Sequence, residues 1–241
     1  MDNITPHSPV DYDRIRAGYD QMWQQGYDDL VRDHVDPDPV PVAMSKRWGI
    51  SAIFRIPEVM SERFEAIVSD LRQWTGDAHL LYDNSNLHTT IFAFECYREN
   101  VLPDDEAVQQ FTIILRELAS DYRSLDIIYQ GLSANRTGII VQGYPLTTHL
   151  QHLRKAIQDR LRTAKLLSGP DAEQLRQGAH VSLVVFGGLI HAATKLASYI
   201  ATNRDTYYGT ASIQQIQIVR YQRMPYAVTI LPFATIDFGG C

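Results

Sequence analysis

The chain has 241 residues, of which 45% are hydrophobic and 21% charged, a balance typical of a soluble globular protein and not of a disordered, fibrous or disulfide-rich one. Its 22 basic and 28 acidic side chains give a net charge of −6. This charge argues against binding to an extended nucleic-acid duplex and leaves a small phosphorylated ligand or the end of an oligonucleotide as a candidate partner.

The two cysteines and the first residues of the chain bear on the cellular compartment of the protein. Cys96 and Cys241 form neither a CxxC pair nor a zinc set, and we expect both to be free thiols in a reducing environment. The opening residues MDNITPHSPVDYDR lack the apolar core of a signal peptide, and no run approaches the ~18 apolar residues of a membrane span. We therefore expect a cytoplasmic protein with no membrane partner, and we leave its oligomeric state open.

Residues 1–46 are expected to form an N-terminal extension that packs on the main domain, which spans residues 47–241. Residues 11–34 are polar with a partial apolar stripe, a pattern compatible with a helix. The proline-rich run 36–41 ends any such helix, because proline removes a hydrogen-bond donor and restricts the residue before it.

From residue 47 onward, strand and helix patterns alternate. We expect strands at 48–56, 87–94, 125–130, 138–142, 181–186, 213–221 and 226–233, and helices at 60–74, 108–118, 150–161 and 196–200. The elements form two comparable halves with no linker rich in Pro, Gly or Ser between them. This order predicts a single α+β domain with two similar lobes.

Each half carries the same short motif at the start of an apolar strand. His88 and Thr90 stand in one motif, and His180 and Ser182 stand in the other. Because side chains alternate between the two faces of a strand, the histidine and the hydroxyl residue of each motif share a face. If the lobes face each other, two imidazoles and two hydroxyls converge on one cleft.

Such a set suits cleavage of a phosphodiester without a metal ion. One neutral imidazole accepts a proton from the attacking water or hydroxyl, and the other, protonated, donates one to the leaving oxygen. Histidine fits both roles because its unperturbed pKa of ~6.5 allows both forms near neutrality. Hydroxyl groups donate hydrogen bonds to the phosphoryl oxygens. Symmetry leaves open which histidine is the acid and which is the base.

These paired His-x-Thr/Ser motifs, with the order of strands and helices over 47–238, resemble the two-histidine (2H) phosphoesterase superfamily, which includes LigT-like RNA cyclic phosphodiesterases. The resemblance implies a pseudo-two-fold symmetric, bilobal α+β fold in which two antiparallel sheets face a central cleft and helices lie outside. It also implies that His88 and His180 are catalytic and that Thr90 and Ser182 bind the substrate phosphate. We expect no metal and no cofactor.

The expected activity is metal-independent cleavage of a phosphodiester, foremost a cyclic phosphate of a nucleotide or RNA end. An RNA 3′-end exonuclease with the same site and a catalytically silent nucleotide-binding module are the alternatives, and the substrate and linkage stay open. A further alternative is an interaction protein that binds a partner through its N-terminal arm. That arm, which small members of the superfamily lack, is placed to cover the mouth of the cleft and restrict substrate size.

Aromatic and arginine residues near strand ends are candidates for further substrate contacts. An aromatic ring can stack on a base, and an arginine can pair with phosphate. The set comprises Arg136, Tyr144, Tyr221, Arg223 and Tyr226. Among them we favour Tyr144 and Tyr226 as cleft residues.

Overall fold

The computed structural model describes residues 10–239 and has the α+β architecture expected from the sequence. Its helices are α1 (Tyr12–Val31), α2 (Glu58–Thr75), α3 (Glu106–Ala119), α4 (His149–Thr163) and α5 (Ala193–Thr202), with a short 3-10 turn at Pro170–Ala172. Its strands are β1 (Ser51–Arg55), β2 (Leu80–Leu81), β3 (His88–Ala93), β4 (Leu125–Asn135), β5 (Gly138–Pro145), β6 (Val181–Val185), β7 (Tyr207–Ile213), β8 (Gln215–Met224) and β9 (Ala227–Asp237).

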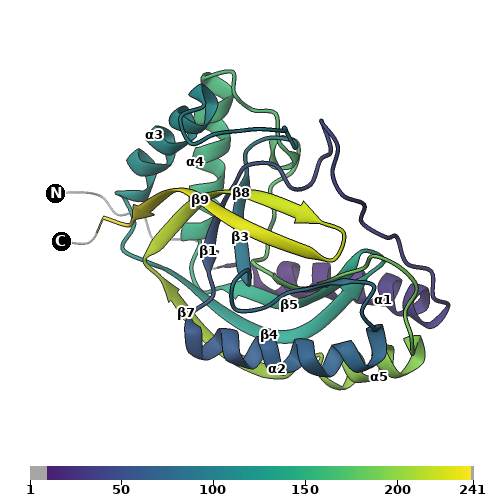
Figure 1. Cartoon of the computed structure of the whole chain (residues 1–241). Helices are drawn as coiled ribbons and strands as arrows, with labels where there is room; N and C mark the ends of the chain where they lie inside the picture. The colour runs from purple at the N-terminus through teal and green to yellow at the C-terminus, as the bar shows by residue number, and fades with distance from the viewer. Residues whose placement is uncertain (1–9, 240–241) are drawn as a thin grey trace.

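The strands form an antiparallel sheet in the order β7-β4-β5-β6-β3-β1-β8-β9, with β2 alongside β6 (Figure 1). At its centre, β3 and β6 share a single register pair, Thr89 with Val181. Apart from the two-residue β2, the sheet therefore consists of two four-stranded halves joined at one junction. We call β1, β3, β8 and β9 the first lobe, and β4, β5, β6 and β7 the second lobe. The family resemblance implies two antiparallel sheets, and in the structure these are joined at the junction into one antiparallel sheet.

The helices lie on the outside of the lobes. Helices α3 and α4 pack against each other and contact β9 and β3 of the first lobe, whereas α1, α2 and α5 pack against strands of the second lobe (Figure 1). Helix α2 follows β1 of the first lobe in the chain but covers the second lobe, and α4 shows the reverse exchange. The two halves of the chain are thus interleaved, which ties the lobes together.

Aromatic side chains fill the core beneath the helices. Phe64 of α2 packs edge-on against Tyr129 and Tyr208 of the second lobe, at ring-centroid distances of 5.8 and 6.0 Å. Phe111 of α3 stacks on Phe94 just after β3, at 4.5 Å. Burying each such ring stabilises the fold by roughly 1.5–3 kcal/mol.

Helix α1 is fastened to the second lobe. Asp11 caps its N-terminus by accepting a hydrogen bond from the backbone nitrogen of Arg14 at 3.0 Å. Tyr19 and Leu30 are buried under it. Gly26 allows the closest approach, since an added Cβ there would lie 2.2 Å from the carbonyl oxygen of Ala134. Only glycine permits this contact between α1 and β4.

Two features of the backbone differ from the sequence expectation. The first strand begins at Ser51 and not at Trp48, because Trp48 has a φ of +72°, a left-handed conformation that a residue with a side chain does not adopt in a regular strand. Strand β7 was not predicted, and the expected strand at 213–221 is divided, with Ile213 ending β7 and Gln215 beginning β8. The C-terminal hairpin itself is confirmed.

Within residues 10–239, no helix combines the length and apolar character needed to cross a membrane. Cys96 is a half-buried free thiol whose sulfur lies 3.6 Å from the carbonyl oxygen of Ser168. Cys241 lies outside the described residues.

Candidate active site

The two His-x-Thr/Ser motifs meet at the junction between the lobes. The antiparallel pair Thr89–Val181 sets His88 across from Ser182 and Thr90 across from His180, since neighbouring positions on two antiparallel strands run in opposite directions. Thr89 and Val181 point to the other face and are fully buried. The Thr89 hydroxyl lies 2.7 Å from that of Tyr129 in the core, which holds this strand in its orientation.

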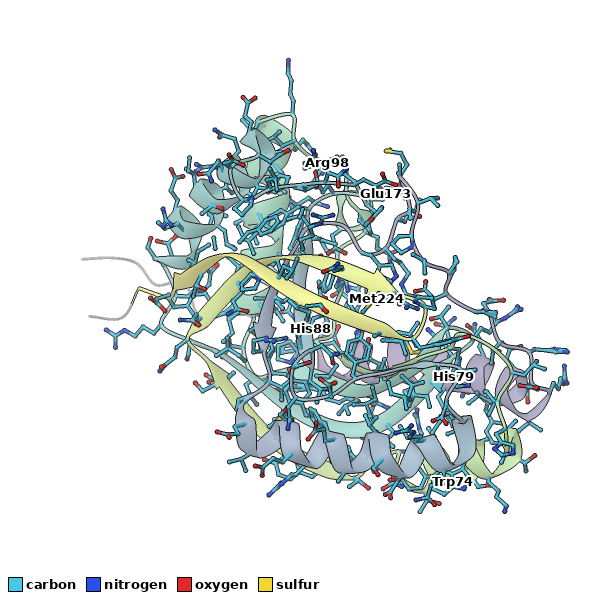
Figure 2. All side chains as sticks on the ribbon, viewed as in Figure 1. Trp74, His79, His88, Arg98, Glu173 and Met224 are labelled. Carbon is cyan, nitrogen blue, oxygen red and sulfur yellow. The ribbon has the colours of Figure 1, made fainter. Side chains whose placement is uncertain are left out.

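All four motif side chains line one pocket of about 330 Å³, which we call the two-histidine pocket. Its other walls include Lys46, Arg47, Trp48, Ser51, Tyr82, Pro170, Arg176 and Tyr221. In Figure 2, His88 lies near the middle of the molecule, beside the β8–β9 hairpin that carries Tyr221. The convergence expected from strand alternation is therefore present in the fold.

His88 is buried and held at both ring nitrogens. Its Nδ1 lies 2.7 Å from the carbonyl oxygen of Asn86, and since a carbonyl only accepts, Nδ1 carries the proton. In the neutral ring, Nε2 then has a free lone pair and accepts a hydrogen bond from the Tyr221 hydroxyl at 3.1 Å. Burial lowers the pKa of His88 to about 4, and the positive charges of Arg55 and Arg176 add to this effect.

His180 stands in a more open position. Its side chain is half-buried, and no group within residues 10–239 forms a hydrogen bond with its ring. The pKa of His180 is lowered to about 3. Burial is the largest cause, and the positive charges of Arg176 and Arg154 come next. Both histidines are therefore neutral near pH 7 when the pocket holds no anion.

Arg176 is a cation that the sequence analysis missed. Its Nε donates to both carboxylate oxygens of Asp171, at 3.0 and 3.1 Å, and Asp171 in turn accepts from the backbone nitrogen of Ala93 at 2.7 Å. This pair fixes the guanidinium at the wall of the two-histidine pocket. Arg176 lies in the irregular segment before β6, where no periodicity marks a residue as facing a site.

The N-terminal arm supplies another wall of the pocket. Asp38 accepts hydrogen bonds from the indole Nε1 of Trp48 at 2.7 Å and from Arg47 at 3.0 Å. Arg47 and Arg223 each lie over the Trp48 ring, at 5.3 and 5.2 Å from its centroid. Lys46, Arg47 and Trp48 all line the pocket, so this segment places two cations in its wall.

Arg154 joins the two motif strands from beneath. Although fully buried on α4, it donates hydrogen bonds to four main-chain carbonyls. Two belong to the first motif strand, those of Ile91 at 2.8 Å and Thr90 at 3.2 Å. The other two precede the second motif, those of Arg176 and Gly178, both at 2.9 Å. One guanidinium therefore sets the relative position of the two motifs.

The two tyrosines favoured from the sequence lie elsewhere. Tyr144 packs against Tyr12 and Tyr19 of α1 and lines a different, smaller hollow. Tyr226 is exposed at the turn of the β8–β9 hairpin and is not part of the pocket lining. Tyr221 occupies the pocket instead. Whether a strand-end tyrosine faces inward depends on the register of β8 with β1, which the sequence alone does not define.

Within the described residues, no three His, Cys, Asp or Glu side chains come together in a way that could hold a metal ion.

No family model matches the chain, and no curated protein sequence matches it. Solved structures do share its fold. Protein TT0787 of Thermus thermophilus is 10% identical over 79% of this chain and 98% of its own length, with a TM-score of 0.62. LigT of E. coli, in complex with 3′-AMP, is 10% identical over 80% of this chain and 98% of its own length, with a TM-score of 0.53. A protein described as a phosphoesterase is 10% identical over 80% of this chain and 99% of its own length, with a TM-score of 0.52. The chain therefore shares the fold of LigT and TT0787.

Proposed function

We propose that this protein is a metal-independent phosphodiesterase that acts on a nucleotide or on the end of an oligonucleotide. The observation that carries the proposal is the convergence of His88, His180, Thr90 and Ser182 on one pocket at the junction of the lobes. The LigT-like fold supports phosphoesterase chemistry, and LigT binds 3′-AMP in a structure with this fold, which supports a nucleotide ligand.

His88 serves as the general base in this proposal. The hydrogen bond from Nδ1 to Asn86 fixes the tautomer and directs the lone pair of Nε2 into the pocket. In the unliganded pocket that lone pair accepts from Tyr221, which shows that a donor can reach it. A water molecule that takes the place of the tyrosine hydroxyl can pass its proton to Nε2 as it attacks phosphorus.

His180 serves as the general acid, and the substrate provides the charge that it needs. In the free protein, burial and then Arg176 hold the pKa of His180 low. A bound phosphodiester brings a negative charge beside Arg176 and so raises the pKa of His180 toward neutrality. The protonated form is thereby favoured only when a substrate is present.

The reaction balances as a hydrolysis. Water oxygen forms a bond to phosphorus while its proton moves to His88, and the bond to the leaving oxygen breaks while His180 donates a proton to that oxygen. The hydroxyls of Thr90 and Ser182 and the guanidinium of Arg176 bind the non-bridging oxygens, where charge develops. Proton exchange with solvent then returns both histidines to their starting states.

The test is an assay in EDTA with 2′,3′-cyclic mononucleotides, 3′,5′-cyclic mononucleotides and a short RNA ending in a 2′,3′-cyclic phosphate. We expect the wild-type protein to cleave at least one of these substrates. We expect the rate to fall at least a hundredfold in His88→Ala and in His180→Ala. His191→Ala is the control, since His191 is exposed and is not in the pocket lining. Wild-type rates in either pocket variant would contradict the proposal.

Two further measurements separate the two alternatives. Shortening of an oligouridine ladder would indicate a 3′-end exonuclease, whereas a cyclic phosphodiesterase changes only the terminal group. Calorimetric binding of a nucleotide without any product would indicate a catalytically silent binding module.

A further inference from the structure

A second hollow opens beside the two-histidine pocket, between α1 and the segment 170–178 that precedes β6. It has a volume of about 830 Å³, and we call it the α1 groove. Pro170, Arg176 and His180 line both the groove and the pocket, so the two hollows adjoin at these residues. Helix α1 runs behind β5 in Figure 1 and forms one wall along its residues 14–22.

The wall formed by α1 is firmly placed. The hydroxyl of Tyr19 donates to the carbonyl oxygen of Gly143 at 3.2 Å and accepts from its backbone nitrogen at 3.3 Å. Arg16 pairs with Asp205 at 2.9 Å on the neighbouring face of the helix. Helix α1, which belongs to the N-terminal arm, is therefore fixed in position and forms a defined wall of the groove.

The lining of the α1 groove has the chemistry of a nucleoside site. Gln21, Gln174 and Gln177 offer carboxamides that both donate and accept hydrogen bonds, and Met22 and Leu175 offer apolar surface. A nucleobase presents an apolar face and an edge of donors and acceptors, which such a lining matches.

Charge argues against a run of phosphates in the groove. Away from the shared Arg176, its charged side chains are one cation, Arg14, and one anion, Glu173. A chain of phosphates needs several cations along its path. One nucleoside without a second phosphate fits this balance.

We propose that the α1 groove is a subsite for a nucleoside that is joined to the reacting phosphate through the oxygen that His180 protonates. This proposal rests on the phosphodiesterase function above and specifies its substrate as a linear diester with a nucleoside on either side. A 2′,3′-cyclic phosphate has both bridging oxygens on one ribose and would leave the groove empty. The two-histidine pocket, at about 330 Å³, holds the phosphate and the other nucleoside.

Gly18 provides a direct test. It lines the α1 groove, and a Cβ added there would meet no atom within 4 Å, so a side chain can be introduced at this position and a tryptophan is the largest one available to occupy the groove. Gln24→Trp is the matched control, because Gln24 is exposed on the same helix, does not line the groove and lies six residues beyond Gly18, about 9 Å along the helix axis.

The probes are 2′,5′- and 3′,5′-linked adenylyl-adenosine and 2′,3′-cyclic AMP. For each variant, kcat/KM on the cleaved dinucleotide is divided by kcat/KM on the cyclic mononucleotide. We expect this ratio to fall at least tenfold in Gly18→Trp and to stay at the wild-type value in Gln24→Trp. An unchanged ratio in Gly18→Trp would overturn the subsite while leaving the phosphodiesterase intact.

Calorimetric titration with the same dinucleotides keeps the two proposals separate. If the wild-type protein cleaves none of the probes, the phosphodiesterase proposal fails. Dinucleotide binding that weakens at least tenfold in Gly18→Trp alone would still support the subsite. Binding that is equal in wild type and Gly18→Trp, or absent from both, would overturn it.

Discussion

The hydroxyl of Tyr221 lies 3.1 Å from Nε2 of His88, although the two residues stand 133 positions apart in the chain. Strand β8 brings the tyrosine to β1 and so to the pocket. Burial raises the pKa of Tyr221, and hydrogen bonding with Thr90 and Ser51 offsets part of the rise. The tyrosine therefore stays protonated and acts as a donor that stabilises the neutral form of His88.

Replacing Tyr221 with phenylalanine removes this donor. We expect the pKa of His88 to rise because its neutral form loses a partner, and we expect kcat not to fall, because the attacking water takes the place of this hydroxyl in the proposed reaction. The pKa is measured from the NMR titration of the imidazole ring. Tyr82→Phe is the control, since the Tyr82 ring lies 5.9 Å from that of His88 and no hydrogen bond joins the two side chains within the described structure.

Arg176 is expected to govern the protonation of His180. Burial is the largest cause of the low pKa of His180, and the positive charge of Arg176 is the second largest. Arg176→Met should therefore raise that pKa in the free protein, while kcat/KM falls about tenfold to a hundredfold because a charged phosphate contact is lost. Arg176→Lys keeps the positive charge and should keep the low pKa. NMR titration of the His180 ring in the wild type and the two variants measures this pKa. Equal pKa values in all three proteins would contradict this role of Arg176.

Arg154 is expected to act as a positioning residue for both motifs. Lysine at this position keeps the charge but cannot reach four carbonyls, so buried acceptors lose their donors and the free energy of unfolding should fall by about 2–4 kcal/mol. Urea unfolding measures this change. Arg160→Lys on the same helix is the control, because Arg160 is exposed and its ion pair with Glu117 contributes little, ~0.5 kcal/mol or less.

A structural role alone would lower stability without changing catalysis in the folded fraction. If Arg154 positions the motifs, Arg154→Lys should also lower kcat on a substrate already cleaved by the wild type, at a temperature where both proteins are folded. Equal kcat values under those conditions would limit Arg154 to the core.

How much of this site follows from the sequence depends on which element carries each residue. His88, Thr90 and Ser182 lie on apolar strands and His180 immediately precedes one, so strand alternation predicted that each histidine shares a face with its hydroxyl residue. Most of the order of strands and helices was predictable for the same reason, with β2 and β7 as the exceptions. The spacing of apolar residues indicates which face of a strand or helix is buried, and the strands and helices of both lobes each have a buried face.

The remaining walls of the pocket lie where periodicity carries no signal. Trp48 follows an expected strand pattern but adopts a left-handed backbone, held in place by Asp38. Arg176 faces the pocket through its ion pair with Asp171, a contact between two irregular segments. The sequence indicates which residues have suitable chemistry in these segments, but only the packed fold determines where they point.

The buried histidines are expected to make the fold sensitive to mild acid. The pKa of His88 is about 4 in the folded protein, against ~6.5 when unfolded, so above pH 6.5 neither state binds a proton there and the group has no effect on stability. As the pH falls below 6.5, the unfolded state binds the proton and the folded state does not, which destabilises the fold. Between pH 7.5 and pH 5 this term costs about 2 kcal/mol. Urea unfolding at both pH values should show a smaller loss in His88→Gln than in wild type, by about that amount. An equal loss in the two proteins would mean that His88 titrates near its unperturbed pKa in the folded state.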